Sequence, residues 1–234
     1  FLVWGPARCR HAGCCVITRS KRVPHRIESG CVAYASAVRA LVDAGRYCEL
    51  DAAGMRALTI RLLQSGDVAE GELATELTAG RLNHTLPVRT GLRDFVTGAW
   101  SLPEAWLAQL VRGRGLPAMA HNVTLSTLDG RRIGTPDGYF LKAAVAVQVH
   151  SRQFHTGLDD RGRDRWEETV EQDGAYAAAG ILCLGVTPTT LRGEPDRFLE
   201  RCASALRSRT GSAIPAIRVG ERQPRWGDPR PATV

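Results

Sequence analysis

Residues 135–155 read TPDGYFLKAAVAVQVHSRQFH, and this stretch decides the predicted fold of the chain. A Pro-Asp-Gly turn that carries Asp137 leads into a strand expected over residues 143–149. Side chains alternate between the two faces of a strand. One face is therefore expected to pack in the core through Val145, Val147 and Val149. The opposite face carries two alanines and then Gln148 and His150, and it points towards the region that Asp137 can reach.

An acid near a turn, followed by a strand with polar groups at alternate positions, is one layout of metal-dependent nuclease sites. Such sites use carboxylates to hold one or two Mg²⁺ ions, which activate water and stabilise the charged transition state. Asp137 is the best candidate ligand, although Pro-Asp-Gly is also a common turn sequence. Glu104 is a second candidate, although the helix dipole also favours an acid in the first turn of a helix.

The polar groups that follow along the strand are not acidic. Gln148 offers a neutral carbonyl oxygen, which is a poor ligand for Mg²⁺ because charge supplies most of the affinity. His150 suits a transition metal better than Mg²⁺. His155 is a candidate general acid or base, with a hydrogen-bonded surface histidine as the alternative. The sequence shows no zinc pattern, Gly-rich phosphate loop, Walker lysine or serine nucleophile elbow.

The composition favours a globular protein with an anionic partner. The chain has 31 basic and 24 acidic residues and a net charge of +7. That charge most simply indicates nucleic acid, with DNA as the expected partner, although a genome that favours arginine codons gives the same excess. The 7 cysteines form no CxxC pair, which favours reduced thiols in the cytoplasm over a disulfide framework. No apolar run is long enough to span a membrane, so no membrane partner is expected. The sequence indicates no particular protein partner.

Apolar spacing and turn signals predict a helical module followed by a small α/β core with a mixed sheet. Short strands are expected within the basic segment 1–30, which either lies on phosphates or forms a solvated edge strand. The spacing predicts helices over 36–46, 51–63, 67–77, 89–97, 102–112, 164–179 and 195–207. Asp51, Asp67 and Ser101 are expected to cap the starts of the second, third and fifth of these helices, and Gly66 is expected to end the second. It predicts strands over 121–128, 131–134, 143–149 and 181–186.

The sequence also predicts four local features of these elements. Asp129-Gly130 is expected to form a tight hairpin turn. The apolar strand 181–186 is expected in the centre of its sheet, and Trp166 and Val170 are expected on the inward face of their helix. The chain is rich in Arg, Pro and Gly from residue 208 onward, which predicts a mostly disordered tail.

The segments that carry a family resemblance are Pro136-Asp137, 145–155 (VAVQVHSRQFH), 165–170 (RWEETV), 178–182 (AAGIL) and Thr187-Pro188. They resemble an actinobacterial family whose C-terminal domain is similar to very-short-patch-repair endonucleases, within the PD-(D/E)XK nuclease superfamily. The resemblance extends from about residue 101 to residue 206. Residues 1–98 resemble the linking region of that family, which often follows an antitoxin-like winged helix.

The resemblance implies a restriction-endonuclease-like mixed sheet flanked by helices, with Mg²⁺ as cofactor. It implies Asp137 as a metal ligand, Glu104 as the helical acid of the site and His155 as an acid or base. The family pattern has glutamate at position 148 and aspartate at position 150, where this chain has Gln148 and His150. Two negative charges are missing, so Mg²⁺ binding is expected to weaken. Repair endonucleases of the superfamily tolerate a non-acidic second ligand, so loss of activity does not follow automatically.

The sequence therefore predicts a linking module over residues 1–98, an endonuclease-like domain over 99–208 and a tail over 209–234. The leading hypothesis is a DNA-binding nuclease relative with a degenerate metal site and weak or no hydrolytic activity. A second hypothesis is an active Mg²⁺-dependent DNA endonuclease with Asp137, Glu104 and Gln148 as metal ligands. A third is an antitoxin-like regulatory protein that uses the nuclease fold only to bind a partner.

Overall fold

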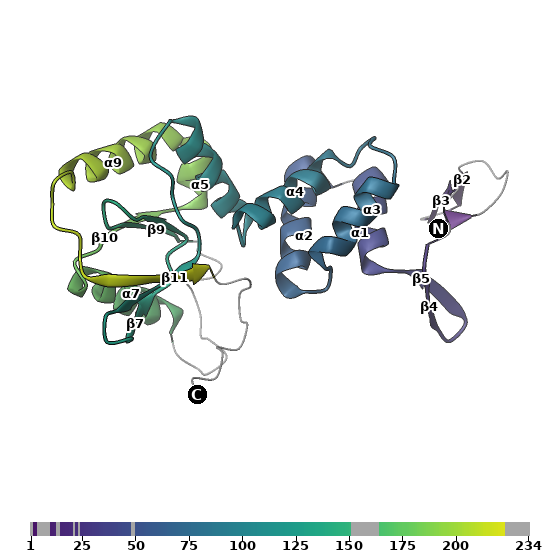
Figure 1. Cartoon of the computed structure of the whole chain (residues 1–234). Coiled ribbons are helices and arrows are strands. Elements are labelled where there is room, and N and C mark those ends of the chain that lie inside the picture. The colour runs from purple at the N-terminus through teal and green to yellow at the C-terminus, as the bar shows by residue number, and fades with distance from the viewer. Residues whose placement is uncertain are drawn as a thin grey trace.

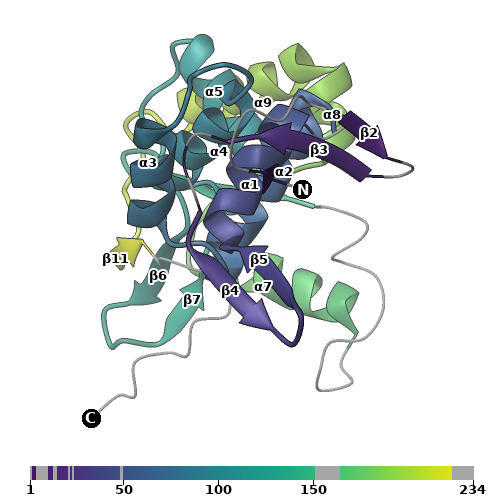
Figure 2. The ribbon, with the colours of Figure 1, turned by 90° about the vertical axis from the view of Figure 1, so that its right-hand side faces the viewer.

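The computed structural model describes residues 2–3, 10–12, 15–20, 22, 24–47, 50–150 and 164–222. It confirms the predicted mixed α/β architecture. A lobe of four helices, α1 to α4, stands beside a lobe that contains a mixed sheet, an antiparallel sheet and further helices. The first strands of the chain lie beyond the helical lobe (Figure 1). Figure 2 shows the same molecule from the N-terminal side, with the hairpin of β4 and β5 towards the viewer.

The N-terminal segment forms short strands, as its apolar pieces predict. These are β1 (Leu2–Val3), β2 (Arg10–Ala12), β3 (Cys15–Arg19), β4 (Arg26–Ser29) and β5 (Val32–Ala35). Strand β3 pairs with β1 in parallel and with β2 antiparallel. Strands β4 and β5 form a separate antiparallel hairpin. Every residue of β4 is exposed, so this hairpin has almost no core of its own.

The helical lobe consists of α1 (Ala37–Tyr47), α2 (Ala52–Ser65), α3 (Glu70–Ala79) and α4 (Leu86–Thr97). Helix α2 begins and ends where the sequence predicts. The Asp51 carboxylate accepts the Gly54 amide at 2.7 Å, and Gly66 ends the helix with a φ of 80°. The prediction that Asp67 caps the third helix is wrong. Helix α3 begins at Glu70, and Asp67 accepts the Ser65 hydroxyl at 2.6 Å instead.

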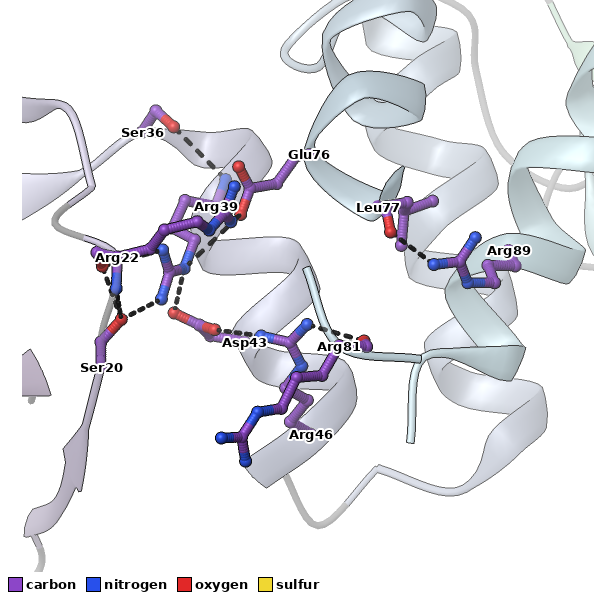
Figure 3. Close-up of polar contacts among 10 residues, drawn as sticks. All are labelled: Ser20, Arg22, Ser36, Arg39, Asp43, Arg46, Glu76, Leu77, Arg81 and Arg89. Atoms are coloured by element: carbon purple, nitrogen blue, oxygen red, sulfur yellow. Dashed lines mark hydrogen bonds and ion pairs between the residues drawn. The ribbon is translucent and has the colours of Figure 1, made fainter. Parts of the chain in front are cut away.

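The arginine Arg39 is buried in this lobe with its charge compensated on several sides (Figure 3). Its Nε lies 2.7 Å from Asp43 Oδ2 and 3.7 Å from Glu76 Oε1. Its Nη2 donates to Ser20 Oγ at 3.1 Å, and Arg22 also pairs with Glu76. A charge removed from water is tolerated only with such partners. The network therefore holds the segment around Ser20 against α1 and α3.

The α/β lobe begins with α5 (Leu102–Gly113) and continues through two three-stranded sheets. Its elements are β6 (Val123–Thr127), β7 (Arg132–Gly134), β8 (Gly138–Phe140), β9 (Val145–Val149), α7 (Arg165–Ala178), β10 (Leu182–Val186), α8 (Pro188–Gly193), α9 (Pro195–Ser208) and β11 (Ile217–Arg222). In one sheet β9 pairs antiparallel with β8 and parallel with β10. In the other, β6 lies between β11 and β7, and the predicted hairpin turn at Asp129-Gly130 is confirmed.

Strand β9 is buried on both faces. The valine face is part of the core, as predicted, and Val145 and Val147 pack with residues of α5 and α9 that include Leu107 and Phe198. The alanine face is also covered, because Ala146 lies in a second cluster that contains Tyr139, Tyr176 and Ile181. Since both faces are filled, the sheet has one fixed register.

Three expectations about this lobe are wrong. Trp166 and Val170 are 61% and 53% exposed, because α7 turns Tyr176 and not those residues into the core. Among the described residues, β10 pairs with β9 alone, so it lies at the edge of its sheet and not in the centre. Part of the predicted tail is ordered, since residues 217–222 form β11 on β6.

The Arg39 network gives a stability prediction. We expect Arg39→Met to lower the free energy of unfolding by about 2 kcal/mol, because Asp43 and Glu76 each lose a close cationic partner in a buried setting. Chemical denaturation followed by circular dichroism measures this change. The control is Arg114→Met, whose exposed pair with Asp196 at 3.6 Å is expected to contribute less than about 1 kcal/mol. Equal effects of the two substitutions would contradict the assignment.

Candidate functional site

Asp137 is held at the end of β9 by two hydrogen bonds. Its Oδ2 accepts the Val149 amide at 2.6 Å, and its own amide donates to Gln148 Oε1 at 3.1 Å. Strand β8 turns back into β9, and the two strands pair antiparallel with Gly138 opposite Val147. This pairing places Asp137, which precedes Gly138, next to Gln148 and Val149. The structure therefore brings together two of the candidate site residues, Asp137 and Gln148.

Glu104 lies in the first turn of α5, where Ser101 caps the helix as predicted. Its side chain is buried and accepts hydrogen bonds on both oxygens. Oε1 accepts the Ser101 hydroxyl at 2.7 Å, while Oε2 accepts the Trp100 amide and the Asn122 side-chain amide, each at 2.9 Å. Glu104 is thus a structural anchor of the helix start as well as a charge close to Asp137.

The two acids are near enough to influence each other electrostatically. Burial raises the pKa of Asp137 well above its ordinary value, the charge of Glu104 raises it further, and the hydrogen bond from Val149 opposes these effects. Burial also raises the pKa of Glu104 against three hydrogen bonds that lower it. A raised carboxyl pKa in a buried pair is a feature that functional sites share with some purely structural pairs.

His121 and Asn122 complete this cluster, and the sequence did not single them out. His121 Nδ1 donates to the backbone carbonyl of Asp137 at 3.1 Å, which places the ring proton on Nδ1. Asn122 is fully buried, has a φ of 52° and bridges Glu104 to the Gly98 carbonyl, which it reaches at 2.7 Å. The only signal in the sequence is their position at the start of the predicted strand 121–128, whereas β6 begins at Val123. The bridge between Ala120 and Tyr139, which brings them to Asp137, is a long-range contact.

The remaining nominated residues lie elsewhere. The ring of His150 packs over Gly185 of β10, where a Cβ atom on residue 185 would lie 2.9 Å from both Cδ2 and Nε2. The His150 amide donates to the Val186 carbonyl at 2.7 Å, which extends the pairing of β9 with β10. His155 lies outside the described residues. The cluster around Asp137 therefore consists of two acids and neutral donors and acceptors.

The oxygens of this cluster do not fit the Mg²⁺ ion that the resemblance implies. The Asp137 and Glu104 carboxylates and the Gln148 carbonyl already accept hydrogen bonds from protein donors. Within the described ranges, no group of three or more His, Cys, Asp or Glu residues is placed to hold a metal ion. Mg²⁺ prefers several oxygen ligands in an octahedron and depends on their negative charge. The described cluster therefore does not provide the ligands of a Mg²⁺ site.

A pocket of about 340 Å³ opens beside the cluster, at the end of the parallel strands β9 and β10. It is lined by His150, Gly185, Val186, Thr187, Thr190, Arg197 and Arg201. Arg201 Nη2 donates to the Gly185 carbonyl at 3.4 Å, and Arg197 Nη1 lies 3.2 Å from Glu194 Oε2. Ligands of open α/β sheets commonly bind at the carboxyl ends of parallel strands.

Comparisons with known proteins leave the site to be interpreted from its own geometry. No family model, curated protein or solved structure matches the chain. Within the part of the chain that the structure describes, none of the helices combines the length and apolar character needed to cross a bilayer. Among the described residues, the acid pair of Asp137 and Glu104 and the pocket lined by Arg197 and Arg201 are the candidate functional features.

The raised pKa of Asp137 predicts a pH-dependent effect of Asp137→Asn. A carboxyl group whose pKa is raised by folding stabilises the folded state below its unfolded pKa, and this contribution is lost as pH rises through the folded pKa. The amide keeps an oxygen to accept from Val149. We therefore expect the free energy of unfolding of Asp137→Asn to rise relative to wild type as pH increases from the ordinary aspartate value of 3.8.

Urea unfolding at a series of pH values measures this difference, and Asp129→Asn is the matched control. The Thr127 hydroxyl lowers the pKa of Asp129, so its stabilising contribution is present above the unfolded pKa and is lost as pH falls through the folded pKa. The Asp129→Asn difference should therefore have the opposite sign. A constant difference between wild type and Asp137→Asn across pH would show that the Asp137 carboxyl is not perturbed.

Proposed function

We propose that the α/β lobe is a DNA-binding, nuclease-like domain with weak or absent phosphodiester hydrolysis. The observation that carries this proposal is the placement of Asp137, which is hydrogen-bonded beside Gln148 at the end of β9 and lies within the electrostatic influence of Glu104. Along the chain, α5 carries Glu104, Asp137 immediately precedes the antiparallel pair of β8 and β9, and α7 and the parallel strand β10 follow. The proposal draws support from this order, because the segments that carry the sequence resemblance lie in or next to these elements.

The charges of the cluster support weak hydrolysis. Metal-assisted hydrolysis depends on carboxylates that bind the ion in their charged form. Here Gln148 is neutral, and the raised pKa values of Asp137 and Glu104 disfavour their charged forms. His150, at the other position where the family pattern has an acid, packs over Gly185 of β10. These features reduce the charge available to a divalent cation.

The basic balance of the chain supports DNA as the partner. The net charge is +7, and the pocket at the end of β9 and β10 is lined by two arginines. Binding to phosphates releases counterions, so affinity for DNA should fall steeply as the salt concentration rises. Fluorescence anisotropy with a labelled duplex at increasing salt concentration measures this dependence. The absence of salt-dependent binding at low ionic strength would exclude the DNA-binding role.

A plasmid-nicking assay with Mg²⁺ and with Mn²⁺ tests the absence of strong hydrolysis. We expect wild type to nick no faster than Asp137→Ala with either ion, because the acid pair lacks the charged third ligand on which metal binding depends. Efficient nicking by wild type that is lost in Asp137→Ala would instead establish an active metal-dependent endonuclease.

Restoring a carboxylate should improve metal binding. Gln148→Glu places a third acid beside Asp137 and Glu104, and its carboxylate can still accept the Asp137 amide. We expect affinity for Mn²⁺ to increase about tenfold or more, since added negative charge is the main source of affinity in such sites. Isothermal titration calorimetry measures the change. The control is Gln109→Glu, which adds the same charge at an exposed position on α5. Equal gains in both variants would refute a local site.

An antitoxin-like role in partner binding is the second candidate function, and the hairpin of β4 and β5 favours it. Three large apolar side chains are exposed there, Ile27 at 49%, Val32 at 44% and Tyr34 at 54%. Exposed apolar groups that lie close together are typical of protein-binding surfaces. If the folded wild-type protein does not bind DNA at low ionic strength, this candidate is favoured over the nuclease-like one.

A further inference from the structure

We propose that the pocket lined by His150, Arg197 and Arg201 binds a phosphate group of the DNA backbone. This inference rests on the proposed function and names the part of the α/β lobe that holds the nucleic acid. The pocket has a volume of about 340 Å³, which is ample for a phosphate and its adjoining sugar atoms.

The pocket lies where two parallel strands end. Strand β9 is followed at once by His150, and β10 is followed at once by Thr187. Because β9 and β10 are parallel, with Val149 paired to Val186, these two residues come to the same edge of the sheet. Helix α9 packs over one face of this sheet (Figure 1) and supplies the arginines. The sheet edge and the helix thus form the walls of the pocket.

The side chains that line the pocket have the chemistry of an anion site. Arg197 and Arg201 are four residues apart on α9, so they lie on one face of the helix. Guanidinium groups match the geometry of phosphate oxygens. The hydroxyls of Thr187 and Thr190 lie 3.0 Å from each other, so one donates to the other and the second O–H can donate to an anion. No carboxylate is among the described residues that line the pocket.

The two arginines differ in how firmly their side chains are held. Arg201 is positioned by its hydrogen bond to the Gly185 carbonyl and by the Phe198 ring, whose centroid lies 5.7 Å from its guanidinium carbon. Arg197 pairs with Glu194 at the rim, but both side chains are largely exposed, at 75% and 63%, so this pair is weak. A phosphate can therefore draw Arg197 away from Glu194 at little cost.

Gly185 keeps the pocket in its present form. The His150 ring occupies the space that a side chain at position 185 would need. His150 thereby lines the pocket, one residue beyond Val149, whose amide donates to Asp137. A phosphate in the pocket and the acid pair would consequently share the end of β9.

The test compares DNA binding of Arg197→Gln/Arg201→Gln with that of a control of equal net charge, Arg112→Gln/Arg207→Gln. All four arginines are exposed, and the control pair lies outside the lining of the pocket. With a labelled duplex and fluorescence anisotropy, we expect the pocket variant to lose about tenfold or more in affinity and about one unit of the salt slope for each phosphate contact removed. The control should stay close to wild type. Equal losses in the two variants would overturn the pocket.

Three ligands distinguish the source of the phosphate and separate this inference from the proposed function. Equal binding of 5′-phosphorylated and 5′-hydroxyl duplexes assigns the pocket to an internal phosphodiester, whereas binding of the phosphorylated duplex alone would overturn that assignment in favour of a strand end. If wild type binds no DNA, the proposed function fails. The inference then depends on inorganic phosphate. In an NMR titration with inorganic phosphate, a shift of the Gly185 amide that is lost in Arg197→Gln/Arg201→Gln would support the anion site. Unchanged spectra would refute it.

Discussion

The pairing of β9 with strands on both sides is the constraint on which the α/β lobe depends. Antiparallel β8 returns Asp137 to the end of β9, and parallel β10 ends at the same edge. Because both faces of β9 are buried, a shift of one residue would exchange valines for alanines in two packed clusters. The strand register that packs the core therefore also places Asp137 and the pocket residue His150 at the same end of β9.

Features that depend on neighbouring residues in the sequence could be predicted. The helix caps at Asp51 and Ser101 and the hairpin at Asp129 are all local hydrogen-bonded units. Features that depend on tertiary partners could not. The apolar strand β10 was expected to be central, but its place in the sheet is set by the available strands and not by its own composition. Trp166 has an apolar side chain in a helix whose core contacts come from the face of Tyr176.

The site shows the same division. Asp137 and Gln148 meet because a turn followed by a strand folds back over a short stretch of sequence, and the pattern predicts this. The participation of His121 and Asn122 could not be predicted, because it depends on the bridge between Ala120 and Tyr139. His150 was expected to face Asp137, but the glycine at position 185 leaves open space over β10 that the imidazole occupies. A glycine in one strand thus decides where a side chain of the next strand lies.

The neutral residues at positions 148 and 150 have a consequence for affinity that is separate from hydrolysis. A phosphodiester next to a group of ionised carboxylates is repelled unless a cation lies between them. With Gln148 and His150 in place of the two acids of the family pattern, less negative charge faces the same edge of the sheet. On the proposed function, an edge with these neutral residues can approach the DNA backbone without the bridging cation that a group of ionised carboxylates would need.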